Sequence, residues 1–154
     1  MKPIKYEQAI RRLTRDCSRC ERCEYEVRRK MAQWGLPDNE QENAIRYLQR
    51  EGFLDEKRFC SAFVHDKSKY NRWGAYKIRY ELQKKQISES LIREALSKID
   101  PATNRQQLKQ LLAAKRKTVQ GKSEYEIQQK LIRFAAGKGF AREDIEAAIE
   151  QISF

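Results

Sequence analysis

The sequence has few residues that break helices and no long apolar run. Its 154 residues include three prolines, six glycines and one histidine. No stretch approaches the roughly 20 consecutive apolar residues of a membrane-spanning helix, and the first ten residues lack the apolar segment of a secretion signal. No alternating β-branched run predicts a strand. We therefore expect an all-α protein of the cytoplasm, with its four cysteines as reduced thiols.

Motifs for catalysis or nucleotide binding are also missing. The single histidine, His65, falls on the polar side of a predicted helix, without a serine or cysteine arranged for nucleophilic catalysis. Gly121-Lys122-Ser123 resembles the end of a P-loop, but Arg116 stands where that motif needs a glycine. We predict neither an enzyme nor a nucleotide site.

Three cysteines form the pattern CxxCxxC at Cys17, Cys20 and Cys23. The pattern suggests zinc or an iron–sulfur cluster, but both need a fourth ligand, and zinc sites usually have a second pair of ligands. Neither Cys60 nor His65 supplies such a pair. We predict no metal or other cofactor, and keep a metal- or redox-sensing protein as an alternative.

A repeat with a period near fifty residues organises the chain. Tyr25, Tyr76 and Tyr125 each open a similar helical pattern, and they are separated by 51 and 49 residues. The helix-capping position two residues before each tyrosine is occupied by Cys23, Gly74 and Ser123. A fixed period of this length is typical of an array of modules that stabilise one another.

The predicted architecture is an elongated tandem array of three three-helix modules, at residues 1–53, 54–100 and 101–154. Helix starts are expected at Asp55, Gly74 and Ser88 in the central module, and at Asp100-Pro101 in the third. Apolar residues at helical spacing predict the central core. This predicted apolar row, drawn from three successive helices, comprises Phe59, Phe63, Tyr70, Ile78, Leu82, Ile92, Ala95, Leu96 and Ile99. Phe154 is expected to cover the end of the third module.

The charge distribution favours a polyanionic partner. The net charge is +11 and the pI is about 9.6, and lysine and arginine contacts to phosphates dominate nucleic-acid affinity. Acidic residues begin the third helix of each module, which argues against a helix-turn-helix repressor. Cations concentrate on the first and second helices of the later modules. They include Lys69, Arg72, Lys77, Arg79, Lys84, Lys85, Lys115, Arg116 and Lys117.

Two aromatic residues, Tyr70 and Trp73, lie among these cations. An aromatic ring beside cations can stack on an unpaired base. The alternative is that Trp73 fills a gap between modules. The sequence leaves both interpretations open.

Two stretches of the central module resemble the RecX family, regulators of the RecA recombinase. Residues 52–59, GFLDEKRF, are similar to that family's signature, as are residues 73–87, WGAYKIRYELQKKQI. Residues 26–31, EVRRKM, resemble the matching part of the first module. Three positions depart from the family pattern, at Cys23, Cys60 and Gln86. All three are structural positions, so they affect local stability more than function.

The resemblance implies a non-enzymatic protein that lies along the RecA–single-stranded-DNA filament. Arrays of this kind are usually monomeric, so we expect a monomer. It implies inhibition of RecA ATP hydrolysis and strand exchange, and thus a role in recombination and DNA repair. We place the RecA- and DNA-binding surface on Trp73 and the nine cations named above. A general nucleic-acid-binding helical repeat protein without a recombinase partner remains the alternative.

Overall fold

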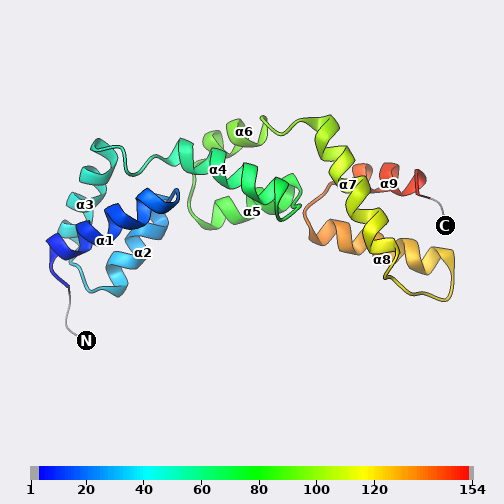
Figure 1. The fold of residues 1–154 in the computed structure, drawn as a ribbon, viewed down its shortest axis with the longest axis horizontal. Coiled ribbons are helices and arrows are strands. Elements are labelled where there is room, and N and C mark those ends of the chain that lie inside the picture. The colour runs from blue at the N-terminus through cyan, green and yellow to red at the C-terminus, as the bar shows by residue number, and fades with distance from the viewer. Residues whose placement is uncertain (1–3, 153–154) are drawn as a thin grey trace.

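Nine helices make up the part of the chain that the structure, a computed structural model, describes, residues 4–152. Figure 1 shows them as three successive groups of three along an elongated molecule. The helices are α1 (Tyr6–Arg19), α2 (Glu24–Gln33), α3 (Asp38–Arg50), α4 (Glu56–Lys69), α5 (Ala75–Lys84), α6 (Glu89–Leu96), α7 (Pro101–Arg116), α8 (Glu124–Gly137) and α9 (Arg142–Glu150). The all-α tandem array is thus confirmed. Phe154 lies outside the described residues.

Local sequence signals define several of the helix starts. The Asp55 carboxylate accepts the Arg58 backbone N–H at 3.0 Å, and Ser88 and Asp100 cap α6 and α7 in the same way. Pro101 occupies the first turn of α7, where its missing N–H costs nothing. Gly52 follows α3 with φ of +78°, a backbone conformation that favours glycine.

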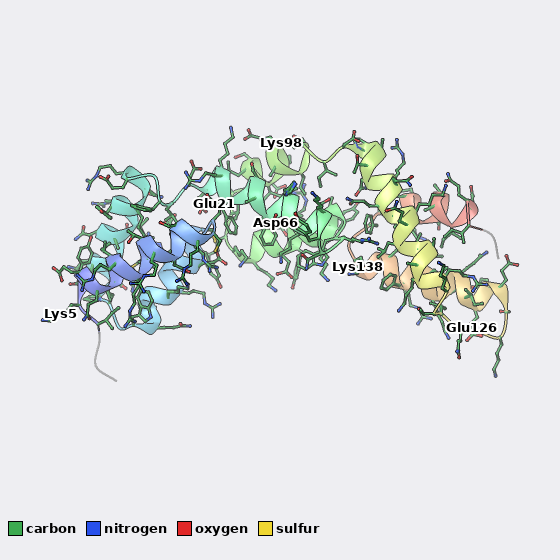
Figure 2. The ribbon with its side chains drawn as sticks, in the orientation of Figure 1. Lys5, Glu21, Asp66, Lys98, Glu126 and Lys138 are labelled. Carbon is green, nitrogen blue, oxygen red and sulfur yellow. The ribbon has the colours of Figure 1, made fainter. Side chains whose placement is uncertain are left out.

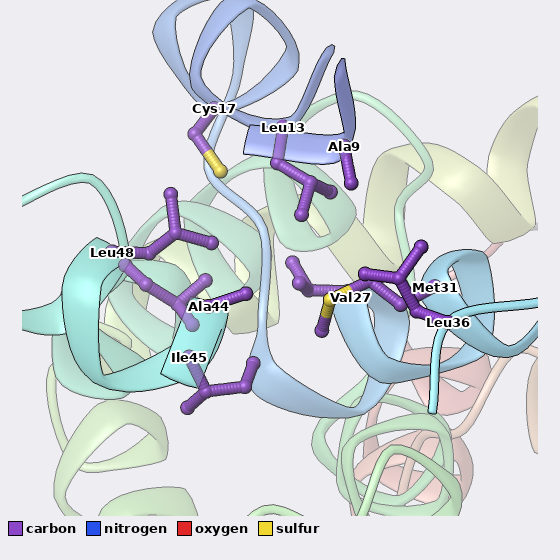
Figure 3. Close-up of a cluster of buried hydrophobic side chains, with 10 residues drawn as sticks. Ala9, Leu13, Cys17, Val27, Met31, Leu36, Ala44, Ile45 and Leu48 are labelled. Atoms are coloured by element: carbon purple, nitrogen blue, oxygen red, sulfur yellow. The ribbon is translucent and has the colours of Figure 1, made fainter. Parts of the chain in front are cut away.

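Each group has its own small apolar core, as Figure 3 shows for the first. Leu13 of α1 points towards Met31 of α2 and Leu48 of α3, and all three side chains are fully buried. Two residues cross the predicted module boundaries. Leu54 packs into the first core, and Cys23 packs into the second. The groups therefore share apolar surface, as units of this size require for stability. The boundaries after residues 53 and 100 stay predictions.

The predicted apolar row of the central module was wrong at Tyr70. This residue lies just past the end of α4, and its side chain is 69% exposed. The last buried residue of α4 is Val64, so the core does not extend as far as Tyr70, whose ring lies against exposed His65 with centroids 6.3 Å apart. The other eight residues of the row are buried or half-buried.

At the junction of the first and second groups, the start of α2 packs against the central core. Cys23 and Tyr25 contact that core, and the Glu24 backbone N–H donates to Glu56 Oε1 at 2.8 Å. Two salt bridges join the groups, Lys85–Glu26 at 3.0 Å and Arg58–Glu21 at 2.6 Å. Figure 2 labels Glu21 at this junction. Charged side chains therefore make many of the contacts at the first junction.

The second junction uses the same part of the repeat but relies on the backbone. The Gly74 N–H donates to the Lys138 carbonyl at 2.7 Å, and the Tyr76 N–H donates to the Gly139 carbonyl at 3.0 Å. Lys138 Nζ donates to the Asn71 carbonyl at 3.3 Å, and Figure 2 labels Lys138 at this contact. A Cβ atom at Gly74 would lie 2.4 Å from the Gly139 oxygen, so the close approach requires glycine.

The equivalent helix start in the third group is capped within that group. Ser123 Oγ accepts the Glu126 N–H at 3.1 Å, and Glu126 Oε2 accepts the Lys122 N–H at 2.9 Å. The three capping residues of the repeat thus work differently. Cys23 packs into the neighbouring core, Gly74 admits a neighbouring backbone, and Ser123 supplies its own acceptor.

Candidate nucleic-acid interface

Three of the predicted interface cations pair with carboxylates. Lys85 bonds Glu26 across the first junction, and both side chains are mostly buried. Arg79 pairs with Glu89, and Lys84 lies 3.4 Å from Glu81. Lys85 therefore joins two groups of helices and is a weak candidate for binding phosphate. The Lys84 side chain is 55% exposed, and pairs with an exposed member contribute little, so its charge can still act on a ligand.

Trp73 packs against the core of the central group. Its ring makes an edge contact with Phe63, with centroids 6.4 Å apart. Lys67 Nζ and Lys77 Nζ lie 5.0 Å and 4.6 Å from the ring centroid, within cation–π range. Trp73 therefore holds two cations in place, and its half-buried ring is poorly placed to stack on a base.

Three of the predicted cations have exposed side chains, in addition to Lys84. Lys69 ends α4, with Nζ 5.4 Å from the Tyr70 ring centroid. Arg72 has φ of +55°, so the backbone turns sharply before α5. Lys117 caps the end of α7. Lys115 and Arg116 are half-buried in the last turn of α7, and Lys115 Nζ lies 4.8 Å from the Phe134 ring centroid.

A further cationic surface lies on α1, outside the predicted interface. Arg12, Arg15 and Arg19 line a hollow of about 210 Å³ together with Asp16, Lys30 and Trp34. Their spacing of three and four residues places them on one face of α1, a signal that was present in the sequence. The arginines of the first group therefore extend the basic surface beyond the central and third groups.

The one carboxylate in this hollow is already neutralised. Burial alone would raise the pKa of Asp16, but hydrogen bonds from Lys30 and Arg22 hold it below its ordinary value. The carboxylate stays ionised, and the charges of Lys30 and Arg22 balance its own. The net charge of the hollow is consequently positive, which suits an anionic ligand.

The three cysteines of the CxxCxxC pattern lie in different surroundings. Cys17 packs into the first core, Cys23 packs into the second, and Cys20 is exposed. Burial raises the pKa of the Cys23 thiol to about 12 and that of Cys60 to about 11. Within residues 4–152, no three His, Cys, Asp or Glu side chains come together as metal ligands. Packing accounts for Cys17 and Cys23.

His65 is exposed on α4, and its Nδ1 lies 3.3 Å from the Asp66 carboxylate. It borders a largely apolar hollow of about 470 Å³ between α4, α6 and α7.

Across the described part of the chain, no helix combines the length and apolar character needed to cross a membrane.

Two family models match the chain in the positions that the repeat suggests. The model described as "RecX, second three-helix domain" matches residues 55–96, and "RecX, third three-helix domain" matches residues 104–149. These ranges cover α4 to α6 and most of α7 to α9.

Curated relatives named "Regulatory protein RecX" match most of the chain. The protein of Clostridium botulinum (strain Eklund 17B / Type B) is 34% identical over 148 residues, which is 94% of this chain and 66% of the relative. The protein of Chlorobium phaeobacteroides (strain BS1) is 33% identical over 150 residues, which is 96% of this chain and 92% of the relative. The chain thus spans about two thirds of the length of the clostridial relative.

Solved structures agree in fold. A crystal structure of regulatory protein RecX superposes with a TM-score of 0.84 at 22% identity, covering 94% of this chain and 71% of that one. The structure of RecX from Lactobacillus salivarius gives 0.79 at 19% identity, covering 95% of both chains. From the matched three-helix domains and the relatives at 33–34% identity, the chain belongs to the RecX family of regulatory proteins.

Proposed function

We propose that this protein binds the RecA–single-stranded-DNA filament and inhibits RecA ATP hydrolysis and strand exchange, thereby modulating recombination and DNA repair. Membership of the RecX family carries this proposal. The elongated array supports it, because three linked groups of helices can contact several subunits of a filament at once. We further propose that it acts in the cytoplasm as a monomer.

The proposed mechanism is occupation of the filament surface, without a chemical step. A RecA filament presents protein and DNA phosphates along a helical groove, and exposed cations of this chain would contact those phosphates. The backbone contacts of Gly74 and Tyr76 hold the central and third groups in a defined orientation. A rigid array bound across subunits would oppose the subunit movements that ATP hydrolysis requires.

The proposed contact surface comprises the exposed Lys69, Arg72, Lys84 and Lys117, with Lys77, Lys115 and Arg116 beside them. Arg79 and Lys85 are weaker candidates because they pair with carboxylates. The arginines of α1 extend this surface into the first group.

The test is RecA ATP hydrolysis on single-stranded DNA, titrated with this protein at fixed salt. We expect inhibition at well below one protein per RecA subunit. A variant with Lys69→Gln, Lys84→Gln and Lys117→Gln should inhibit more weakly. A control with Arg46→Gln, Arg93→Gln and Arg142→Gln loses equal charge from the third helices and should inhibit normally. Absence of inhibition by the unaltered protein would refute the proposal.

A general nucleic-acid-binding protein is the second candidate, supported by the net charge of +11. It predicts a steep salt dependence of binding to bare DNA, with no effect on RecA. Loss of three phosphate contacts on a single strand would reduce the slope of log K against log salt by about 2. The RecA assay of the unaltered protein therefore distinguishes the two candidates, and the charge variants test the contact surface under either one.

A further inference from the structure

The groove between α5 and the end of α8 has two exposed aromatic rings on one wall. Tyr76 and Tyr80 are one helical turn apart on α5, and their side chains are 65% and 59% exposed. They line a hollow of about 380 Å³, which is completed by Lys77, Glu81, Ala136, Gly137 and Gly139. Large exposed aromatic side chains with no core partner are a feature of binding surfaces.

The repeat itself does not require this pair of rings. Tyr76 corresponds to Tyr25, which packs against the neighbouring core, whereas Tyr80 corresponds to Arg29 and Gln129 in the other two groups. Three-helix units of this chain thus form with arginine or glutamine at the Tyr80 position. Packing does not explain Tyr80.

The opposite wall of the groove offers backbone and very small side chains. Ala136 and Gly137 are exposed at the end of α8, and a Cβ atom at Gly137 would meet nothing within 4 Å. A flat ring can therefore enter beside the tyrosines without displacing side chains from α8. The hollow is large enough for one such planar group and the sugar attached to it.

The charges around the groove suit a nucleotide. Lys84 Nζ lies 5.2 Å from the Tyr80 ring centroid, and Lys77 is held at the base of α5 by the Trp73 ring. Glu81 also lines the groove, but Lys84 pairs with it at 3.4 Å. Cations beside exposed aromatic rings are the combination with which proteins bind unpaired bases and their phosphates.

We propose that the Tyr76–Tyr80 groove stacks an unpaired base of single-stranded DNA and so favours single strands over duplex. A base inside a duplex already stacks on its neighbours, so duplex DNA can use the cations but not the rings. This inference rests on the proposed function for the identity of the nucleic acid. It replaces Tyr70 and Trp73, which the sequence suggested, with two residues that the structure brings to a groove.

The test compares binding of a fluorescent oligothymidylate and a matched duplex at several salt concentrations. Tyr76→Leu with Tyr80→Leu should weaken single-strand binding about 5- to 150-fold, the range expected for loss of one stacked base. Duplex affinity and the salt slope should not change, because no charge is removed. Tyr76→Phe with Tyr80→Phe keeps the rings and should retain affinity. Tyr125→Leu removes an equally exposed ring on α8 and is the control.

A second measurement locates the base directly. Irradiation of the complex with a 5-iodouracil oligonucleotide should cross-link Tyr76 or Tyr80, as identified by peptide mass spectrometry. Equal loss of single-strand and duplex binding, or unchanged binding, would overturn the proposal. So would weaker RecA inhibition with unchanged DNA binding, because the groove would then hold a protein side chain. If the unaltered protein inhibits RecA but does not bind bare single strands, this inference fails while the proposed function stands.

Discussion

Replacing Gly74 by alanine should separate the central and third groups of helices. The new Cβ would lie 2.4 Å from the Gly139 oxygen and 2.6 Å from the Phe140 nitrogen, which are both backbone atoms. The φ of Gly74 is −82°, so alanine is compatible with the local conformation and the effect is purely steric. The two backbones must move apart by roughly 1 Å to reach ordinary contact distances.

This movement would break the hydrogen bonds at the junction. The Gly74–Lys138 and Tyr76–Gly139 distances of 2.7 Å and 3.0 Å would exceed hydrogen-bonding range. Each such bond contributes about 0.5–1.5 kcal/mol, so we expect the junction to lose about 1–3 kcal/mol. The cores of the two groups do not include Gly74 and should remain folded.

Amide hydrogen exchange at Tyr76 measures this loss directly. This N–H belongs to the first turn of α5, and its acceptor is the Gly139 carbonyl across the junction. A loss of 1–3 kcal/mol corresponds to exchange about 5- to 150-fold faster. Gly137→Ala, where the Cβ meets nothing within 4 Å, is the matched control and should leave Tyr76 protected. Unchanged exchange in the Gly74 variant would refute the steric argument.

Three further predictions concern charges and thiols. Burial raises the pKa of Glu56 above its ordinary 4.5. The folded state therefore binds the carboxyl proton more tightly than the unfolded state does, and the free energy of unfolding falls as pH rises through the window just above 4.5. Glu56→Gln should therefore stabilise the protein at neutral pH and flatten this dependence in denaturant titrations; a larger pH dependence would contradict it. Lys85→Met should lower the free energy of unfolding by about 1 kcal/mol or more through loss of a mostly buried pair, with little change in the salt slope of DNA binding. Lys84→Gln should leave the free energy of unfolding nearly unchanged and make the salt slope of DNA binding shallower. At pH 8, an alkylating reagent should modify the exposed Cys20 and spare Cys23, whose pKa is about 12, until the protein unfolds; rapid labelling of Cys23 would show that the first junction opens.

The repeat and most of the helix boundaries could be read from the sequence because their signals are local. The tyrosines near fifty residues apart, the caps at Asp55 and Ser88, and Pro101 in the first turn of α7 each act within a few residues. Tyr70 was misplaced because helical spacing does not show how far along α4 the core extends, and its last buried residue is Val64. Spacing gives the face of a helix on which a residue lies, but packing against the neighbouring helices determines whether that residue is buried.

The candidate interface was less predictable. Clustered lysines and arginines indicated a polyanion partner, but a sequence does not show which cations already have partners. Lys85 and Glu26 are 59 residues apart and meet across the first junction. The arginines of α1 had a readable spacing, yet their single carboxylate, Asp16, is neutralised by Lys30, which belongs to the next helix.

By itself, the sequence determined the all-α array, its period, the excess of positive charge and the resemblance to the RecX family, since these depend on composition and on spacing within single helices. The tertiary structure decided how the groups meet. It showed why Gly74 must be glycine, and it placed Tyr76 and Tyr80 in a groove while Trp73 packs on a core. Contacts between groups join residues from 32 to 67 positions apart, and their geometry depends on the relative placement of whole helices, which no local pattern encodes.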